Sequence, residues 1–526
     1  MKLLNIKTDE YSMPSSRSIY RIMYILLALS VILRGIIAGS IELGNDEVYY
    51  WTYAKFPAAS HFDHPPMVGL VIQAFTWNLE FDGEFFIRLA SVVLGTASTW
   101  LMFLIGKLIK NPLTGLYAAM MFTASFYGFV LSGTFILPDT PQVFFWLISL
   151  YLLLKILPEK PPSKMVKNLI LYAGVTIGLA FLSKYHSLFL LSGAFLYMIF
   201  YNRGLFRLKE TYGALFIFIL LTLPVVFWNV ENKFISFTYH ENRVGITDSG
   251  LQPQYFLTEL AGQFFYNNPV NVIIIVFAMV ALIRGRSFLD AAYVRILLLI
   301  GMPLILLFLG FSLFQRTLPH WTGPGYLGLI LIAAAYLSEP RGESQNSRLV
   351  PWPVAASLGF MIFVVVVAVG QIRSGWIPLQ RQGMEDVTHD LACWKQLGEK
   401  FAIAAKSNEA QGLITKNAPI LTFRWFPAAN FDYYVGRKTN RPVYALGTLE
   451  RIHKYSWINK TRGPLKQGSD AWYIALSDDF EDPDALYGNL YSMIVPADTL
   501  VLTRGDEIVR KAFLYRMIWL KEDLDF

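Results

Sequence analysis

Long apolar stretches separated by short polar connections fill the first 371 residues of the chain. A helix needs about 20 predominantly apolar residues to cross the hydrocarbon core of a bilayer. The pattern predicts about 11 transmembrane helices of this kind. They fall near residues 20–40, 88–106, 112–132, 139–157, 168–183, 186–202, 212–230, 269–284, 293–313, 322–338 and 349–371.

The pattern changes after residue 371. Short alternating runs typical of strands, such as residues 418–423, are interspersed with helical patterns such as residues 393–406. We therefore predict a transmembrane domain over 1–371 and a small α/β domain over 372–526. The second segment has a common size for a globular domain.

Basic residues predict the orientation of the chain. Lys and Arg cluster before the first helix and in alternate connections after it, and such residues accumulate on the cytoplasmic side of membrane proteins. We therefore expect the N-terminus in the cytoplasm. An odd number of helices then places residues 372–526 on the outer side, together with the long first outer loop over 41–87.

Composition supports the membrane class. Hydrophobic residues make up 54% of the 526 and charged residues only 16%, whereas a soluble domain has roughly 25% charged residues. These values exclude disordered, collagen-like and disulfide-rich secreted chains, and the single cysteine excludes an internal disulfide. The net charge of +7 reflects basic inner loops, so we expect no nucleic-acid partner.

Ionisable residues gather at the predicted outer ends of the helices, where they are costly and call for a function. They are Asp46 and Glu47, Asp63 and His64, Asp139, Lys184 and His186, His240 and Arg243, and Arg316 and His320. Carboxylates accept a proton from an attacking hydroxyl or bind a divalent cation, and cationic groups stabilise a leaving phosphate. The combination predicts transfer of a group from a lipid-linked phosphate.

Each of these residues also has a purely structural interpretation. Asp46 and Glu47 suit a solvated loop. Asp139 precedes Thr-Pro, a pattern typical of a helix N-cap, and Lys184 suits a lysine that extends to the membrane surface. Both interpretations stay open for each residue, and the gathering of all of them on one side favours the functional one.

Four motifs carry a resemblance to a known family. GNDEVYYW (44–51), FDHPP (62–66), LPDTPQVFFW (137–146) and LSKYHSLFLL (182–191) resemble the bacterial branch of the dolichyl-phosphate-mannose protein mannosyltransferase family. This branch includes aminoarabinose transferases that modify lipid A and galacturonosyltransferases of the lipopolysaccharide core. The resemblance implies a polytopic α-helical membrane protein with the GT-C fold, located in the bacterial inner membrane.

The resemblance also implies an activity. It is the inverting transfer of a sugar from a polyprenyl-phosphate-linked donor to an envelope glycolipid, another glycan or a protein, on the extracytoplasmic face. Such an enzyme uses no nucleotide cofactor. The resemblance leaves open whether the enzyme uses a divalent metal cation, because related enzymes differ in their need for one.

Roles for individual residues follow from the same resemblance. The catalytic carboxylates would be Asp46, Glu47 and Asp139. The donor phosphate would contact Arg243, Lys184, His64, Arg316 and Trp321. His64 departs from the family, which has lysine at this position, and histidine is only partly charged near neutral pH. Asp63 and His240 would be the metal ligands.

Two other functions compete with this one. A transporter or flippase of lipid-linked sugars would show repeated halves with interrupted helices, and it would not need a carboxylate-rich first outer loop. A glycan polymerase or ligase would concentrate its chemistry in one very large late loop. The sequence places that chemistry in the first outer loop, which favours the glycosyltransferase.

Overall fold

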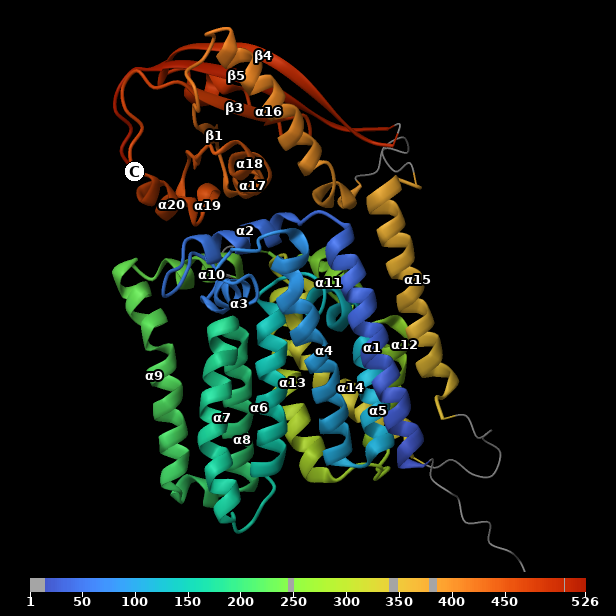
Figure 1. The fold of residues 1–526 in the computed structure, drawn as a ribbon. Helices are drawn as coiled ribbons and strands as arrows, with labels where there is room; N and C mark the ends of the chain where they lie inside the picture. Colours follow the sequence, from blue (N-terminus) through green and yellow to red (C-terminus); the bar gives the residue numbers. More distant parts are fainter. Residues whose placement is uncertain (1–14, 245–249, 340–348, 378–385, 506) are drawn as a thin grey trace, which may run out of the picture.

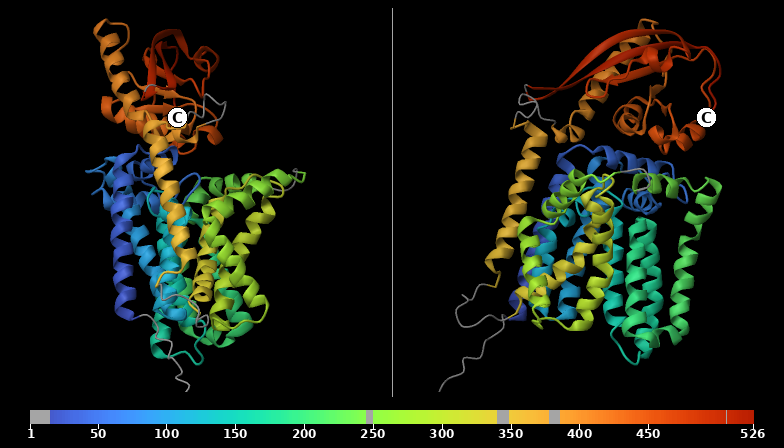
Figure 2. Two further views of the ribbon diagram at one scale, coloured as in Figure 1. Left: turned by 90° about the vertical axis from the view of Figure 1, so that its right-hand side faces the viewer. Right: turned by 180° about the vertical axis from the view of Figure 1, so that it is seen from behind.

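The computed structural model describes residues 15–244, 250–339, 349–377, 386–505 and 507–526. Helices of the first part stand side by side in a bundle, and a smaller part with a β-sheet covers one end of this bundle (Figure 1). The last helix of the bundle stands along its side and leads to the sheet (Figure 2).

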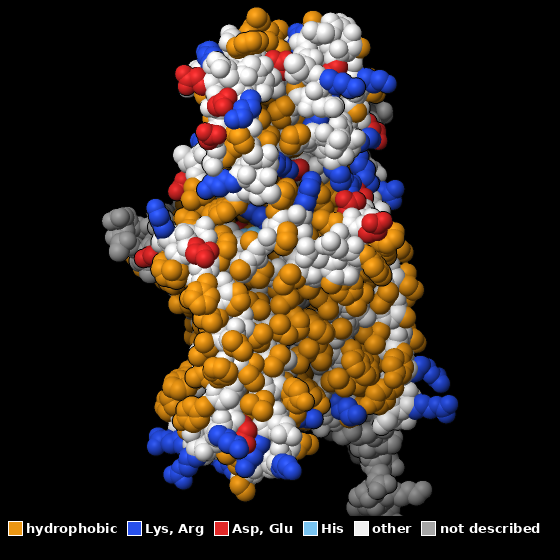
Figure 3. All heavy atoms as spheres, turned by 60° about the vertical axis from the view of Figure 1, so that its left-hand side comes forward, with side chains coloured by type: hydrophobic (Ala, Val, Ile, Leu, Met, Phe, Trp, Pro, Cys, Tyr) orange, Lys and Arg blue, Asp and Glu red, His pale blue; other side chains and the backbone are white. Residues whose placement is uncertain are grey.

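Every apolar stretch predicted from the sequence coincides with a helix of the bundle. These helices are α1 (Ser16–Ser40), α4 (Glu84–Ile109), α5 (Pro112–Thr123), α6 (Asp139–Ile156), α7 (Lys164–Ser183), α8 (Leu188–Tyr201), α9 (Lys209–Glu231), α12 (Pro269–Ile283), α13 (Ala291–Phe311), α14 (Gly323–Leu337) and α15 (Trp352–Ser374). Figure 3 shows apolar side chains forming a broad band across one face of this bundle, with Lys and Arg at the end away from the sheet and charged residues of both signs over the sheet domain.

Not all of these helices have the length of a full crossing. Within the described residues, seven are long and apolar enough to span a membrane, and α12 forms an eighth candidate together with α11 (Pro253–Tyr266), across a bend of 98°. Three others, α5, α8 and α14, have only 12, 14 and 15 residues. The number of about 11 complete crossings therefore stays a prediction.

Short helices occupy the connections at the covered end of the bundle. They are α2 (Asn45–Lys55), α3 (Met67–Phe75), α10 (Ile235–Val244) and α11, and in Figure 1 they lie across the ends of the long helices. The predicted first outer loop therefore contains two helices. Asp46 and Glu47 lie in the first turn of α2, where the helix dipole favours negative charge. Residues 47–54 of α2 are all buried.

The C-terminal part is a mixed α/β unit around a five-stranded sheet in the order β2-β1-β3-β5-β4. Its strands are β1 (Ile420–Thr422), β2 (Val443–Ala445), β3 (Ala471–Leu476), β4 (Tyr491–Arg504) and β5 (Glu507–Leu520). β1 pairs in parallel with β2 and β3, and β5 lies antiparallel between β3 and β4. Its helices are α16 (Trp394–Ala410), α17 (Trp425–Asn430), α18 (Arg437–Thr439), α19 (Leu449–Ile452), α20 (Tyr455–Arg462) and α21 (Pro483–Tyr487).

The sheet domain packs directly on α2. Trp51 of α2 meets Tyr433 edge to face, with ring centroids 5.1 Å apart. The hydroxyl of Tyr434 accepts a hydrogen bond from the backbone N–H of Leu43 at 2.6 Å. Both sides contribute to one buried apolar cluster, so α2 is clamped between the bundle and the sheet domain.

We expect Gly106→Leu to lower the thermal stability of the protein. A Cβ at Gly106 of α4 would lie 2.6 Å from Cα of Gly115 in α5, so a larger side chain forces these helices apart. Overpacking of this kind costs about 1–3 kcal/mol. Thermal unfolding in detergent micelles measures the effect.

Gly359→Leu provides the matched control, because a Cβ at Gly359 of α15 meets nothing within 4 Å. An equal fall in the unfolding temperature of both variants would contradict the importance of the close approach between α4 and α5.

Candidate active site

A cavity of about 870 Å³ lies where the sheet domain meets the ends of the helices nearest to it. Seven of the ten residues predicted from the sequence line it: Asp46, Asp63, His64, Asp139, Lys184, His240 and Trp321. They come from segments far apart in the chain, so the fold brings most of the predicted site together.

Asp46 and Glu47 point in different directions from the first turn of α2. Asp46 is exposed and lines the cavity, whereas Glu47 is buried and does not. Successive residues of a helix are rotated by about 100°, because one turn takes 3.6 residues. One of the two neighbouring acids therefore faces the cavity and the other faces the protein interior.

Glu47 forms a buried ion pair with Arg88 of α4. Arg88 donates from Nε to Oε1 of Glu47 at 2.7 Å and from Nη2 to Oε2 at 2.5 Å. Its remaining N–H groups donate to the carbonyls of Ala38, Ile41 and Glu42. Glu47 also accepts from the backbone N–H groups of Gly44 and Ile136. Every group of the pair is satisfied, so Glu47 anchors the start of α2.

Asp139 and Lys184 form a second buried ion pair, and both residues line the cavity. Nζ of Lys184 lies 2.8 Å from Oδ2 of Asp139, and the hydroxyl of Tyr127 donates to Oδ1 at 3.0 Å. Asp139 is the first residue of α6 and its side chain does not cap that helix. The N-cap interpretation of Asp139 is therefore wrong. Lys184 is buried, so it does not extend to the membrane surface.

Asp63 and its neighbours form the wall of the cavity between α2 and α10. Oδ1 of Asp63 accepts from the hydroxyls of Tyr49 and Tyr53. His64 lies 4.0 Å from Oδ2 of Asp63, and burial lowers the pKa of His64 to about 3. The His64 ring is therefore neutral near neutral pH, which weakens its predicted role as a phosphate contact.

The side chains of the two predicted metal ligands, Asp63 and His240, do not point at a common position. Nε2 of His240 lies 2.7 Å from the backbone carbonyl of Asp63, while the Asp63 carboxylate is engaged by tyrosine hydroxyls. Over the residues that the structure describes, no group of three or more His, Cys, Asp or Glu side chains is arranged to hold a metal. A bound metal stays a prediction, and no step below depends on one.

The structure does not place two of the predicted phosphate contacts in the cavity, for different reasons. Arg316 is exposed and is not among the residues that line it. The backbone of Arg243 belongs to α10, but its side chain lies outside the described residues.

The sheet domain contributes two residues to the cavity that the sequence did not suggest. Trp425 and His453 line it, with their rings stacked 5.5 Å apart, and Phe62 stacks on His453 at 4.5 Å. Trp425 begins α17 shortly after β1, and His453 directly follows α19; neither belongs to a recognisable motif. Only the docking of this domain on α2 brings them over the carboxylates.

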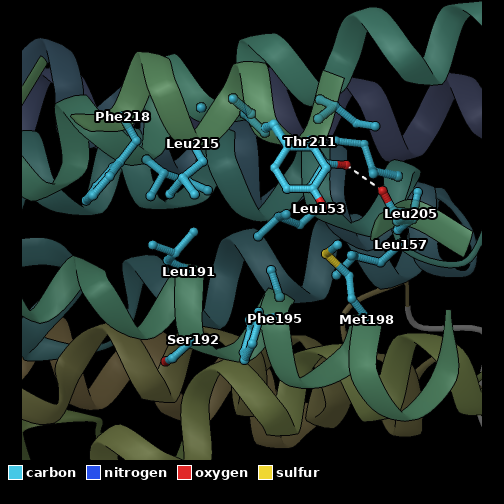
Figure 4. Close-up of a pocket in the computed structure, with 18 of the residues that line it drawn as sticks. Leu153, Leu157, Leu191, Ser192, Phe195, Met198, Leu205, Thr211, Leu215 and Phe218 are labelled. Carbon is cyan, nitrogen blue, oxygen red and sulfur yellow. Dashed lines mark hydrogen bonds between the residues drawn. The ribbon is translucent and has the colours of Figure 1, made fainter. Parts of the chain in front are cut away.

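An apolar groove of about 580 Å³ adjoins the polar cavity. Residues of α6, α7, α8 and α9 line the groove, and Leu188 borders both spaces. Figure 4 shows Leu191 and Phe195 of α8 facing Leu215 and Phe218 of α9. At its far end the groove reaches Leu205, which follows the end of α8. The groove thus extends along the length of α8.

Solved structures of known proteins share this architecture. The crystal structure of ArnT from Cupriavidus metallidurans bound to undecaprenyl phosphate superposes with a TM-score of 0.60 at 14% identity, over 95% of this chain and 98% of that chain. The structure of the same enzyme in the apo state superposes with a TM-score of 0.59 and covers the same fractions of the two chains. The protein is thus a polytopic membrane protein with the GT-C fold and a small C-terminal sheet domain, as the sequence predicts.

Sequence comparisons also show similarity to known glycosyltransferases. A family model described as dolichyl-phosphate-mannose-protein mannosyltransferase matches residues 63–228. The lipid A galacturonosyltransferase RgtD of Rhizobium johnstonii is 24% identical over 300 residues, which are 56% of this chain and 61% of that protein. The match thus spans about three fifths of the length of this relative. These findings confirm the predicted resemblance to the bacterial lipid A-modifying branch of the family.

We expect Glu47→Gln to destabilise the protein, because it leaves the buried Arg88 guanidinium without its counter-charge. Breaking a buried ion pair from one side costs about 3–5 kcal/mol. Glu399→Gln is the control, since Glu399 pairs with Lys438 on the exposed surface, where such pairs contribute about 0–1 kcal/mol. Thermal unfolding of both variants is the measurement, and equal unfolding temperatures would refute the anchoring role of Glu47.

Proposed function

We propose that the protein is an integral-membrane glycosyltransferase that moves a sugar from a polyprenyl-phosphate-linked donor to an acceptor, with inversion at the anomeric carbon. One observation carries the proposal: a polar cavity with an accessible carboxylate and a buried lysine borders an apolar groove along the helices, and Leu188 lines both. A donor with a charged head and a long hydrocarbon tail has the same division into polar and apolar parts.

Lys184 is the proposed contact of the donor phosphate. One N–H of its ammonium group donates to Asp139, so further N–H groups remain for phosphate oxygens. Asp139 holds this ammonium group in place within the cavity through their 2.8 Å ion pair. Trp321 also lines the cavity and offers a ring face beside it. A fixed positive charge stabilises the phosphate as negative charge develops on it.

The groove suits the tail of the donor. From Leu188 to Tyr201, α8 rises about 20 Å, which exceeds half of the roughly 30 Å hydrocarbon thickness. A tail that begins at the outer cavity and follows this groove therefore passes beyond the middle of the bilayer. Polyprenyl chains are long enough to do this.

Asp46 is the proposed general base. Its carboxylate takes the proton of an acceptor hydroxyl as the hydroxyl oxygen attacks the anomeric carbon. The bond between this carbon and the phosphate oxygen breaks, and the polyprenyl phosphate leaves with the electron pair. Asp46 and Lys184 line the same cavity, so the attacking and leaving groups have separate partners.

The acceptor and the location belong to the same proposal. The curated relative acts on lipid A, as its name states, so we propose a lipid A-type glycolipid as the acceptor. The Lys and Arg residues at the opposite end of the bundle support a cytoplasmic position for that end. We therefore propose that the cavity lies on the outer face of a bacterial inner membrane. A transporter is disfavoured because it needs no accessible general base.

We expect Asp46→Asn to reduce transfer about 10²–10⁴-fold, the usual contribution of a general base. Asp46 is exposed, so the thermal unfolding of the variant should match the wild type. Transfer of labelled sugar from a polyprenyl-phosphate donor to lipid A in proteoliposomes is the measurement. Glu80→Gln, at an exposed acid of the same outer segment, serves as the control. Undiminished turnover of Asp46→Asn would remove Asp46 from the mechanism.

We expect Ser192→Trp to raise the KM for a long-chain donor several-fold, because the indole fills the apolar groove that Ser192 lines. A donor with only two or three isoprene units should be used as well as by the wild type. Leu220→Trp, on an exposed position of α9 outside the groove, is the control. Equal effects of Ser192→Trp on both donors would place the tail elsewhere.

A further inference from the structure

A second polar cavity of about 450 Å³ lies between the end of α2 and helix α20 of the sheet domain. The chain after α2, from Lys55 to Phe62, contributes one side of it. Lys454, Trp457 and Lys460 of the sheet domain contribute the other side, and Trp228 of α9 completes it. None of the catalytic roles proposed above uses this cavity.

Lysines dominate the charged residues that line this second cavity. It includes Lys55, Lys454 and Lys460, and no carboxylate side chain is among the described residues that line it. The nearby carboxylate of Asp432 lies 3.6 Å from Lys55, but it already pairs with Arg462 at 2.5 Å. The first cavity, in contrast, is lined by four acids, Asp46, Asp63, Asp139 and Glu241.

Aromatic rings place the second cavity at the membrane surface. Trp228 lies near the outer end of α9, where tryptophan commonly marks the level of the lipid headgroups. Its ring lies 5.5 Å from that of Trp457, whose Nε1 donates to Asn232. Aromatic faces and lysines together suit a sugar that carries phosphate.

Only a thin wall separates the two cavities. Phe62 lines the second cavity and stacks on His453, which lines the first. Lys454 is held beside this wall by hydrogen bonds from Nζ to the carbonyls of Thr52 and Phe56. α2 connects Asp46 at its start to Lys55 at its end, a rise of about 14 Å. A headgroup of a few sugar rings covers such a distance.

We propose that this second cavity binds a phosphate group of the acceptor glycolipid, with Lys55 and Lys460 as the phosphate contacts and Trp228 and Trp457 beside the sugar. The assignment rests on the proposed glycosyltransferase function and adds a site for one end of its acceptor. Two kinds of lipid could supply such a phosphate, namely lipid A through its sugar headgroup and an ordinary anionic phospholipid. We assign the phosphate to lipid A.

The test compares the wild type with the double variant Lys55→Gln/Lys460→Gln, in nanodiscs of phosphatidylcholine. Diphosphorylated lipid A and its dephosphorylated counterpart serve as acceptors. We expect the double variant to raise KM for diphosphorylated lipid A roughly tenfold, the effect of losing charge-assisted hydrogen bonds. The kcat, the KM of the donor and the KM of the dephosphorylated acceptor should stay unchanged. Lys406→Gln/Lys416→Gln, at exposed lysines of the sheet domain outside this cavity, controls for the loss of two charges.

A binding measurement without donor separates this proposal from the enzymatic one. The dissociation constant of diphosphorylated lipid A should rise in the double variant by the same factor as KM, even in a preparation that transfers no sugar. An unchanged dissociation constant, or an equal rise for the dephosphorylated lipid, would overturn the site. Competition by phosphatidylglycerol at equal concentration would also overturn it, because the cavity would then bind any anionic headgroup.

Discussion

The buried ion pair between Glu47 and Arg88 is the constraint on which the rest of the site depends. Arg88 uses all its N–H groups to join the end of α1, the start of α2 and α4. Buried charges are tolerated only when they are paired and hydrogen-bonded in this way. The pair fixes the first turn of α2, and helix geometry then directs the neighbouring Asp46 into the cavity. Of the two acids in this motif, Glu47 thus holds the helix and Asp46 faces the cavity.

The sheet domain is a structural part of the candidate site. It presses α2 against the bundle through rings such as Trp51 and Tyr433, and it supplies Trp425 and His453 to the cavity. Its α20 also forms one side of the second, cationic cavity. Two polar spaces therefore flank α2, one acidic and aromatic and the other lined by lysines, and an apolar groove borders the first of them at Leu188. This division matches a reaction that has a lipid tail, a reacting centre and an anionic acceptor to accommodate.

Hydropathy predicted the long helices well, because crossing a bilayer imposes a local requirement on consecutive residues. It did not predict α2, in which residues 47–54 are buried on all sides and leave no periodic pattern. The family resemblance identified seven of the residues that line the cavity, but it did not reveal that Lys184 pairs with Asp139, 45 residues away. It also grouped Glu47 with Asp46, although only the fold distinguishes an inward from an outward carboxylate. No sequence motif marked Trp425 or His453, since their position at the cavity follows only from the docking of the sheet domain.

The central claim is that this cavity transfers a sugar from a lipid-linked phosphate to a glycolipid. Purified protein in liposomes, supplied with a polyprenyl phosphate that carries a ¹³C-labelled sugar and with unlabelled lipid A, tests it most directly. NMR and mass spectrometry of the recovered lipids give both the location and the anomeric configuration of the label. The account predicts labelled lipid A with the inverted configuration and free polyprenyl phosphate in equal amount. Donor that crosses the bilayer intact, with no label on lipid A, would contradict the account and favour a transporter.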